Sequence, residues 1–148
     1  MPDTPAIELI RLTKCFDKVT ACDCIDMDVR HGEVLALLGE NGSGKTTLTN
    51  MLSGIYQPDA GQIMLDGQAV IIRSPRDAIR LGIGMIHQHF KLVEVLSARE
   101  NILLGQAGLI RIPPEEAASS FGFQVDLDKK VYDMSVSEKQ AVEILKVL

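Results

Sequence analysis

The sequence predicts an α/β fold whose N-terminal part carries an antiparallel β subdomain. Residues 7–12 and 25–29 are short apolar segments with the alternation of half-buried strands. Residues 34–38 form a continuous apolar run, which predicts a strand buried on both faces. A glycine-rich loop and an amphipathic helical pattern follow this run directly. At 148 residues the chain is expected to form one domain.

Composition narrows the class of protein. Apolar residues make up 46% and charged residues 24%, as in ordinary soluble proteins. A formal net charge of −5 argues against a nucleic-acid partner. There is no apolar run of membrane-spanning length, and the first residues do not resemble a signal peptide, so we expect a cytoplasmic protein. The cysteines Cys15, Cys22 and Cys24 lack the paired spacing of a zinc site and are expected to be reduced structural thiols.

The middle of the chain predicts a hairpin, a helix and a short strand. Asp66-Gly67 separates two apolar runs within residues 61–72, which is a hairpin signal. Ser74-Pro75 then supplies a cap and a first helical residue, and Gly82 ends the predicted helix. Residues 83–87 are expected to form another strand.

The last third of the chain contains two helix starts of the same kind. Ser97 and Glu100 form a capping-box pattern ahead of an apolar run. Ser135 and Glu138 repeat it ahead of an apolar stripe that continues to the last residue. Between the two boxes only a short helix after Pro113-Pro114 is indicated. These helices predict a short helical insertion.

Residues 39–46 match the phosphate-binding pattern G-x-x-x-x-G-K-[ST] in full. Glycines allow successive N–H groups to surround phosphates, and the helix that follows points its N-terminus at the same charge. Lys45 can reach the β- and γ-phosphates, and the Thr46 hydroxyl can bind Mg²⁺. The motif predicts a P-loop NTPase core that binds ATP with Mg²⁺. Its expected phosphate-binding residues are Gly39, Glu40, Asn41, Gly42, Ser43, Gly44, Lys45, Thr46 and Thr47.

A chance glycine-rich turn is the alternative to this interpretation. The apolar run before the loop and the amphipathic pattern after it argue against chance. The motif itself does not separate transport ATPases from GTPases, kinases or helicases, which share it.

Further stretches resemble the ATP-binding cassette (ABC) transporter ATPases. Residues 39–48 are similar to the P-loop of that family, and residues 54–63 to the segment that leads into its antiparallel hairpin. Lys14-Cys15-Phe16 resembles the segment that stacks an aromatic ring on adenine, so the resemblance implies this role for Phe16. A core aromatic is the alternative interpretation of Phe16.

Residues 84–105 resemble the Q-loop region of importers for nucleosides and simple sugars. The resemblance implies that Gln88 binds Mg²⁺ or orders the attacking water, and that it links the site to a membrane partner. His87 and His89 also allow a metal site, but there is no third ligand near them in the sequence.

Residues 134–140 resemble the signature segment, which contacts ATP held by the opposite protomer. The resemblance implies that Ser135 makes this contact in trans; alternatively, Ser135 only caps its own helix. Ser137 stands where the family has glycine, and its side chain would crowd a close phosphate.

Taken whole, the resemblance implies that residues 1–148 are a partial nucleotide-binding domain, truncated after the signature helix. The Walker B aspartate, the catalytic glutamate and the switch histidine of the family would follow Leu148. The implied function is an ATPase subunit, or its N-terminal fragment, that powers import of a nucleoside or simple sugar. A nucleotide-binding module without turnover and an ABC protein of translation or DNA repair are the alternatives.

The resemblance also implies partners. They are a second nucleotide-binding domain in a head-to-tail dimer, transmembrane permease subunits and, indirectly, an extracytoplasmic solute-binding protein, with no nucleic acid. The expected location is peripheral, at the cytoplasmic face of the cell membrane.

Overall fold

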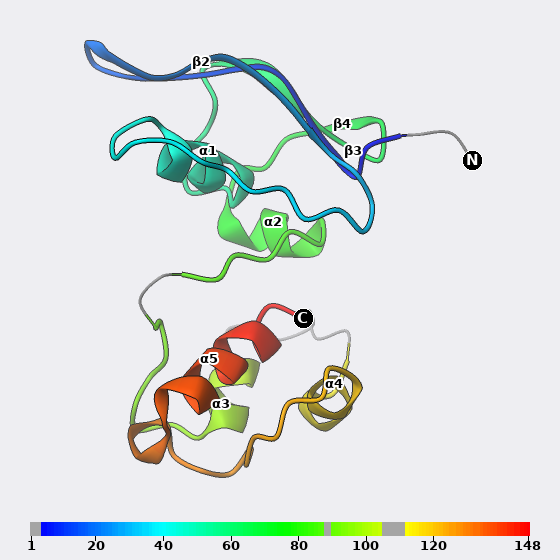
Figure 1. Ribbon diagram of the computed structural model, residues 1–148, viewed down its shortest axis with the longest axis vertical. Helices are drawn as coiled ribbons and strands as arrows, with labels where there is room; N and C mark the ends of the chain where they lie inside the picture. The colour runs from blue at the N-terminus through cyan, green and yellow to red at the C-terminus, as the bar shows by residue number, and fades with distance from the viewer. Residues whose placement is uncertain (1–3, 88–89, 105–111) are drawn as a thin grey trace. The chain divides into compact units, whose positions relative to one another are not determined.

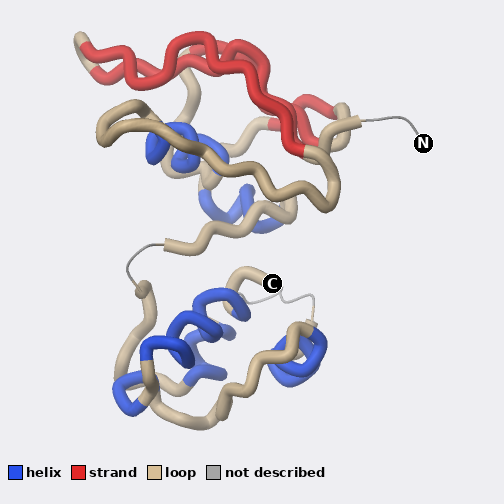
Figure 2. The backbone as a smooth tube through the Cα atoms, viewed as in Figure 1, coloured by secondary structure: helices blue, strands red, loops and turns tan. Residues whose placement is uncertain are grey.

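The computed structural model describes residues 4–87, 90–104 and 112–148. These residues form two compact units, one ending at Ile83 and the other beginning at Gly84 (Figure 1). Figure 2 shows strands in the first unit and only helices and loops in the described part of the second. Each unit is described by itself.

A four-stranded antiparallel sheet forms the framework of the first unit. Its strands are β1 (Ile7–Phe16), β2 (Val19–Val29), β3 (Ala60–Leu65) and β4 (Gln68–Val70), in the order β2-β1-β3-β4. The predicted strands at 7–12 and 25–29 are confirmed as parts of longer ones. The predicted hairpin is also confirmed, and its turn residues Asp66 and Gly67 have φ of 48° and 76°, as a tight hairpin turn requires.

The pairing of β1 with β2 is interrupted by irregular register. Arg11 and Cys24 both have φ of 48°, a conformation that breaks the regular ladder. Side chains supply the missing acceptors: Asp26 Oδ1 accepts from the Arg11 N–H at 2.7 Å. Likewise, Thr13 Oγ1 accepts from the Cys24 N–H at 3.0 Å. The strand main chain therefore keeps its hydrogen bonds through the irregular stretch.

Two helices accompany the sheet in this unit, α1 (Lys45–Leu52) and α2 (Pro75–Arg80). Ser74 caps α2 as predicted, since its Oγ accepts from the Asp77 N–H at 3.2 Å. Gly82 follows the helix with φ of 85°. Buried side chains from the sheet, both helices and the connecting loops form one core, consisting of Leu9, Leu12, Cys22, Leu48, Met51, Ile63, Ile72 and Ala78.

The predicted strand at residues 34–38 is wrong. Val34 is 96% exposed and Leu38 is 88% exposed, and neither lies in a strand. A strand buried on both faces needs neighbouring strands to take up its main-chain groups, and the strands in the described part of the chain pair only with each other. The strand expected at residues 83–87 is also absent.

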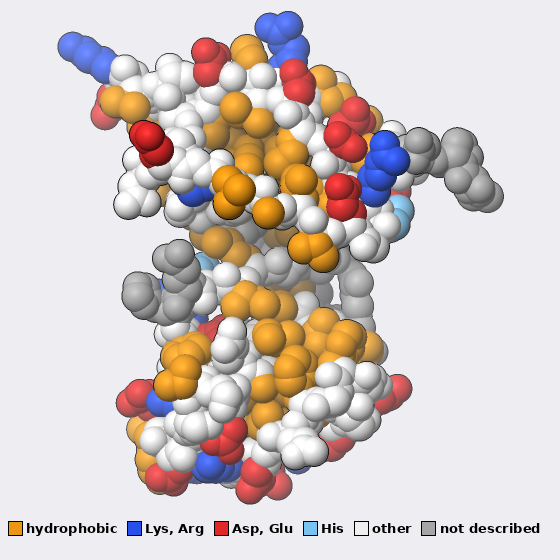
Figure 3. Space-filling view, viewed as in Figure 1, with side chains coloured by type: hydrophobic (Ala, Val, Ile, Leu, Met, Phe, Trp, Pro, Cys, Tyr) orange, Lys and Arg blue, Asp and Glu red, His pale blue; other side chains and the backbone are white. Residues whose placement is uncertain are grey.

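Figure 3 shows apolar side chains on the surface of both units.

The second unit contains α3 (Ala98–Leu103), α4 (Pro114–Ser120), the short 3₁₀ helix η1 (Val131–Asp133) and α5 (Val136–Leu145). Both predicted capping boxes are confirmed. The short helix expected after Pro113 is confirmed as α4. The core of this unit comprises Ala98, Ile102, Ala117, Ala118, Leu127, Val131, Met134, Val142 and Leu145.

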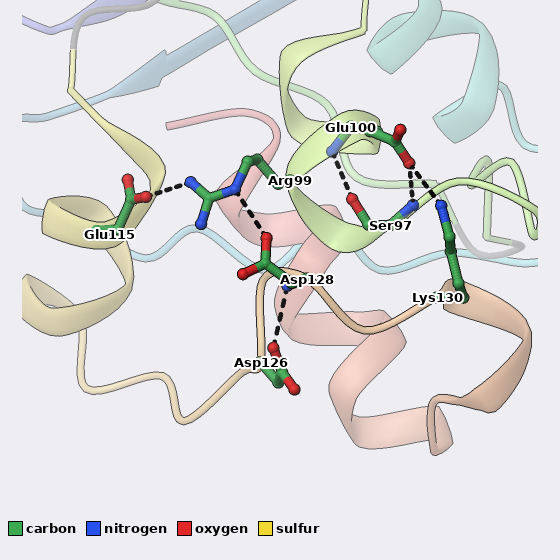
Figure 4. Close-up of polar contacts among 7 residues, drawn as sticks. All are labelled: Ser97, Arg99, Glu100, Glu115, Asp126, Asp128 and Lys130. Carbon is green, nitrogen blue, oxygen red and sulfur yellow. Dashed lines mark hydrogen bonds and ion pairs between the residues drawn. The ribbon is translucent and has the colours of Figure 1, made fainter.

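Polar contacts tie the segment before α5 to α3 and α4 (Figure 4). Arg99 of α3 contacts both Glu115 of α4 and Asp128, the latter at 3.1 Å. The Arg99 guanidinium lowers the pKa of the Glu115 carboxyl below its ordinary value. Lys130 Nζ donates to Glu100 at 3.1 Å, beside the capping box of α3. These contacts position the chain that leads into α5.

Candidate functional site

The loop of residues 39–47 leads into α1 with an unusual backbone. Gly42 and Gly44 both have φ of 88°, and Gly44 is the N-cap of α1. The Ser43 N–H donates to the Glu40 carbonyl at 3.2 Å, which closes a turn inside the loop. Left-handed residues next to right-handed ones make the concave backbone that binds anions.

Gly44 also marks a close approach between the loop and β2. A Cβ at this position would lie 2.2 Å from the Ala21 carbonyl oxygen, so there is no room for a side chain. The Cys22 thiol lies beside it, with its sulfur 3.7 Å from the Gly44 carbonyl oxygen. Burial raises the pKa of the Cys22 thiol, which fits a structural role. All three cysteines are free thiols.

Lys45 folds over the loop that precedes it. Its ammonium group donates to the carbonyl oxygens of Gly39 at 2.7 Å and Glu40 at 2.6 Å. It also donates to Ser43 Oγ at 3.2 Å. A cation is thus held at the loop next to the positive N-terminal end of α1, whose first turn carries no acidic side chain. This arrangement can attract and hold a polyphosphate.

The residues present fit Mg²⁺ bound together with a polyphosphate. Thr46 follows Lys45 in the first turn of α1 and is exposed, so its hydroxyl can act as a hard oxygen ligand. The described residues contain no cluster of three or more His, Cys, Asp or Glu side chains able to hold a metal. Mg²⁺ here would depend on the Thr46 hydroxyl, phosphate oxygens and water, which is its usual coordination at nucleotides.

Phe16 lies at the end of β1, at the surface of the first unit. Its side chain is 39% exposed, so the interpretation as a core aromatic is wrong. Tyr56 packs against its edge with centroids 5.1 Å apart, and Lys14 Nζ lies 5.5 Å from the ring centroid.

The Asp59 carboxyl binds the residues just before Phe16. Asp59 Oδ1 lies 2.9 Å from Lys14 Nζ, and Asp59 Oδ2 accepts from the Cys15 N–H at 2.7 Å. The Cys15 N–H and Lys14 together lower the pKa of the Asp59 carboxyl.

Ser135 caps α5 in the second unit, and its N–H and hydroxyl form hydrogen bonds within the first turn of that helix. Its N–H donates to Glu138 Oε2 at 2.7 Å, and its Oγ donates to the same oxygen at 2.8 Å. Lys129 Nζ lies 2.8 Å from Glu138 Oε1. The Lys129 ammonium and the Ser135 donors lower the pKa of the Glu138 carboxyl from 4.5 to about 2. Ser137 Oγ lies 3.1 Å from Ser135 Oγ.

The predicted site residues divide between the two units. Residues 39–47 and Phe16 lie in the first unit, and Ser135 lies in the second. Gln88 and His89 lie outside the described residues, so their predicted roles stay predictions.

Three residues that hold other parts of the structure in place are not predicted from the sequence. Tyr56 packs against the edge of Phe16, which is distant from it in the sequence, and no local pattern predicts that contact. Asn101 and Glu143 are 0% and 3% exposed. The sequence feature that could have identified Asn101 and Glu143 is a polar residue at an apolar position of a predicted helix.

Comparison with known proteins decides which P-loop class this is. The sequence profile described as ABC transporter matches residues 22–148. The chain belongs to the ABC transporter family. Within this family, it is 44% identical to the guanosine import ATP-binding protein NupO of Bacillus subtilis strain 168, over 96% of this chain and 30% of that protein.

Two further import ATP-binding proteins are similar to this chain to about the same degree. The chain is 40% identical to the nucleoside import ATP-binding protein NupA of Lactococcus lactis, over 100% of this chain and 31% of that protein. It is 43% identical to the ribose import ATP-binding protein RbsA 1 of Rubrobacter xylanophilus, over 97% of this chain and 31% of that protein. The chain therefore spans about a third of the length of these relatives.

Solved ABC structures share the fold. CbiO1 from Clostridium perfringens, described as part of the ABC transporter complex cbiONQ, has a TM-score of 0.79 at 28% identity, covering 99% of this chain and 62% of that one. The ADP conformation of the cassette MJ1267 has a TM-score of 0.80 at 21% identity, covering 99% of this chain and 65% of that one. Across the described ranges, the helices of this chain are all too short or too polar to cross a membrane.

Proposed function

We propose that this chain is the ATP-binding part of an ABC transporter that imports a nucleoside or a simple sugar. The observation that carries the proposal is Lys45, held by the oxygens of Gly39 and Glu40 beside the N-terminus of α1. The relatives that this chain matches include import ATP-binding proteins for guanosine and ribose, which supports the class of solute.

In this proposal the first unit binds the nucleotide. The amides of residues 39–47 surround the phosphates, and Lys45 exchanges its bonds to loop oxygens for bonds to phosphate oxygens. Thr46 holds Mg²⁺, which when bound neutralises phosphate charge. Phe16, exposed and supported at its edge by Tyr56, stacks on the adenine ring.

Two proposed roles extend beyond nucleotide binding by the first unit. Gln88 is a further ligand of Mg²⁺ or orders the attacking water. Ser135 contacts ATP held by a second nucleotide-binding domain in a head-to-tail dimer. This contact requires Ser135 to loosen its bonds to Glu138, which now hold both its N–H and its hydroxyl.

We extend the proposal to the whole protein, of which these residues are a part. Its ATPase activity would use a general base outside residues 1–148. Permease subunits in the membrane would carry the solute, and an extracytoplasmic binding protein would deliver it. The protein would then lie peripherally at the cytoplasmic face of the cell membrane. Co-purification with membrane subunits supports this assignment, whereas co-purification with ribosomes or DNA contradicts it.

The decisive experiment replaces Lys45 and measures ATP affinity by isothermal titration calorimetry. Lys45→Ala should weaken binding of ATP by about 100-fold or more, because charge-assisted bonds to phosphate are lost. Lys130→Ala is the matched control, since it removes one positive charge from the surface of the second unit. Equal ATP affinities of the Lys45→Ala and Lys130→Ala variants would contradict the assignment of residues 39–47 as an ATP-binding loop.

A further inference from the structure

Three contacts tie Asp59 to the end of β1. The Asp59 N–H donates to the Thr13 carbonyl at 2.9 Å, and Asp59 Oδ2 accepts from the Cys15 N–H at 2.7 Å. Asp59 Oδ1 lies 2.9 Å from Lys14 Nζ. One residue thus binds three successive residues of the strand, and Phe16 is the residue that follows them.

These contacts extend the sheet past the last pair between β1 and β3. That pairing ends where Thr13 lies opposite Ala60, the first residue of β3. Beyond this pair, the Asp59 carboxylate supplies the acceptor for the Cys15 N–H that a strand residue would otherwise supply. The end of β1 is therefore held on this side by a side chain, which can be removed without changing the ladder of the sheet.

Lys14 gives the charge of Asp59 a second role. The Lys14 side chain is only 14% exposed, and a cation largely removed from water needs an opposite charge beside it. Lys14 Nζ also lies 5.5 Å from the centroid of the Phe16 ring, within the range of a cation–π contact. Asp59 therefore acts on Phe16 in two ways, through the main chain at Cys15 and through the position of the Lys14 ammonium.

Tyr56 holds the same ring from the segment that follows α1. The Tyr56 and Phe16 rings are 5.1 Å apart with 73° between their planes, an edge-to-face contact. The Tyr56 N–H donates to the carbonyl of Asn50 in α1 at 3.1 Å. Residues 53–59 therefore connect the Phe16 ring with α1, the helix that directly follows the phosphate-binding loop.

We propose that Asp59 is a positioning residue for Phe16, which fixes the end of β1 so that the ring is already in place when a nucleotide base stacks on it. Phe16 lies at the surface, so packing in the core does not fix its ring. A ring held in place by Asp59, Lys14 and Tyr56 does not have to be ordered on binding, which lowers the entropic cost of the contact. The inference rests on the proposed stacking of Phe16 on adenine.

The proposal is tested with the full chain by comparing the affinities for ATP and for inorganic tripolyphosphate, both with Mg²⁺, by isothermal titration calorimetry. Asp59→Ala should weaken ATP binding about threefold and leave tripolyphosphate binding unchanged, because only ATP carries a base. Asp59→Asn keeps an acceptor for the Cys15 N–H and should lose less. Asp28→Ala is the matched control, since Asp28 lies opposite Glu8 at the other end of β1, and it should leave both affinities unchanged.

A double-mutant cycle with Phe16→Ala separates positioning from a structural defect. If Asp59 acts through the ring, Asp59→Ala should have no further effect on ATP affinity once Phe16 is alanine. Should Asp59→Ala not fold, Asp59→Asn completes the same cycle. Equal losses for ATP and tripolyphosphate, a further loss in the Phe16→Ala background, or no loss of ATP affinity at all would each overturn the proposal.

Lys45→Ala distinguishes failure of this inference from failure of the proposed function. It should weaken binding of both ATP and tripolyphosphate. If Lys45→Ala leaves both affinities unchanged, the ATP-binding assignment itself is wrong. If Lys45→Ala and Phe16→Ala weaken ATP binding but Asp59→Ala does not, only the present inference is wrong.

Discussion

Asn101 binds both main-chain polar groups of Val93, accepting from its N–H at 2.7 Å and donating to its carbonyl at 3.0 Å. The same amide donates to the Ser97 carbonyl at 2.9 Å. One fully buried side chain thus joins the first turn of α3 to the segment in front of it. This contact ties Val93 to α3.

The first prediction concerns this amide. Asn101→Leu removes three side-chain hydrogen bonds and leaves the Val93 N–H without its acceptor, so it should lower the free energy of unfolding by about 2–4 kcal/mol. Urea denaturation followed by circular dichroism measures the change. Gln124→Leu, at an exposed position, is the control and should shift stability by less than about 0.5 kcal/mol. Equal effects of the two variants would contradict the arrangement.

The second prediction compares two glycines of the first unit, both with positive φ. Gly32 has φ of 73° and open space around it, so Gly32→Ala should cost only about 1–2 kcal/mol. Gly44→Ala should cost clearly more, about 3 kcal/mol or above, because its Cβ would meet the Ala21 carbonyl at 2.2 Å. Thermal unfolding of both variants provides the comparison. A smaller loss in Gly44→Ala than in Gly32→Ala would disprove the close approach.

The third prediction concerns the aromatic ring at the end of β1. Phe16→Ala should weaken ATP binding about fivefold, which corresponds to the ~1 kcal/mol of an aromatic contact. Phe16→Tyr keeps the ring and should bind as the wild type does. Phe121→Ala, which removes an exposed ring from the second unit, controls for loss of apolar surface. Fluorescence titration with a labelled ATP analogue distinguishes these outcomes.

The fourth prediction concerns acid stability. The pKa of the Glu138 carboxyl falls from 4.5 to about 2 in the folded protein, chiefly through Lys129. Because the folded pKa is depressed, the carboxylate stabilises the fold above pH 4.5, and this contribution is lost as the pH falls from 4.5 towards 2.

Glu138→Gln removes that titration. The variant should have a lower Tm than the wild type at pH 7, and the difference should shrink between pH 4.5 and pH 2. Lys129→Met should show most of the same effect, since Lys129 is the largest cause of the shift. Thermal unfolding across this pH range provides the measurement, with Glu116→Gln in the exposed first turn of α4 as control. A Tm difference independent of pH would refute the assignment.

Local patterns in the sequence were enough to predict the loop of residues 39–47, the Asp66-Gly67 turn and both capping boxes. Each depends on groups at most a few positions apart, and the chemistry of those side chains decides the geometry. The apolar run at residues 34–38 does not form the predicted strand, because strand formation depends on neighbouring strands that the run itself does not contain.

The sequence by itself therefore determined the phosphate-binding loop, the family and the helix starts, since these lie in contiguous residues. Only the tertiary structure decided that Phe16 stands exposed against Tyr56 and that Gly44 must be a glycine. It also decided that Glu143 reaches Lys91, 52 positions away along the chain. Contacts between distant residues follow from how elements pack, and no local pattern of side chains encodes that packing.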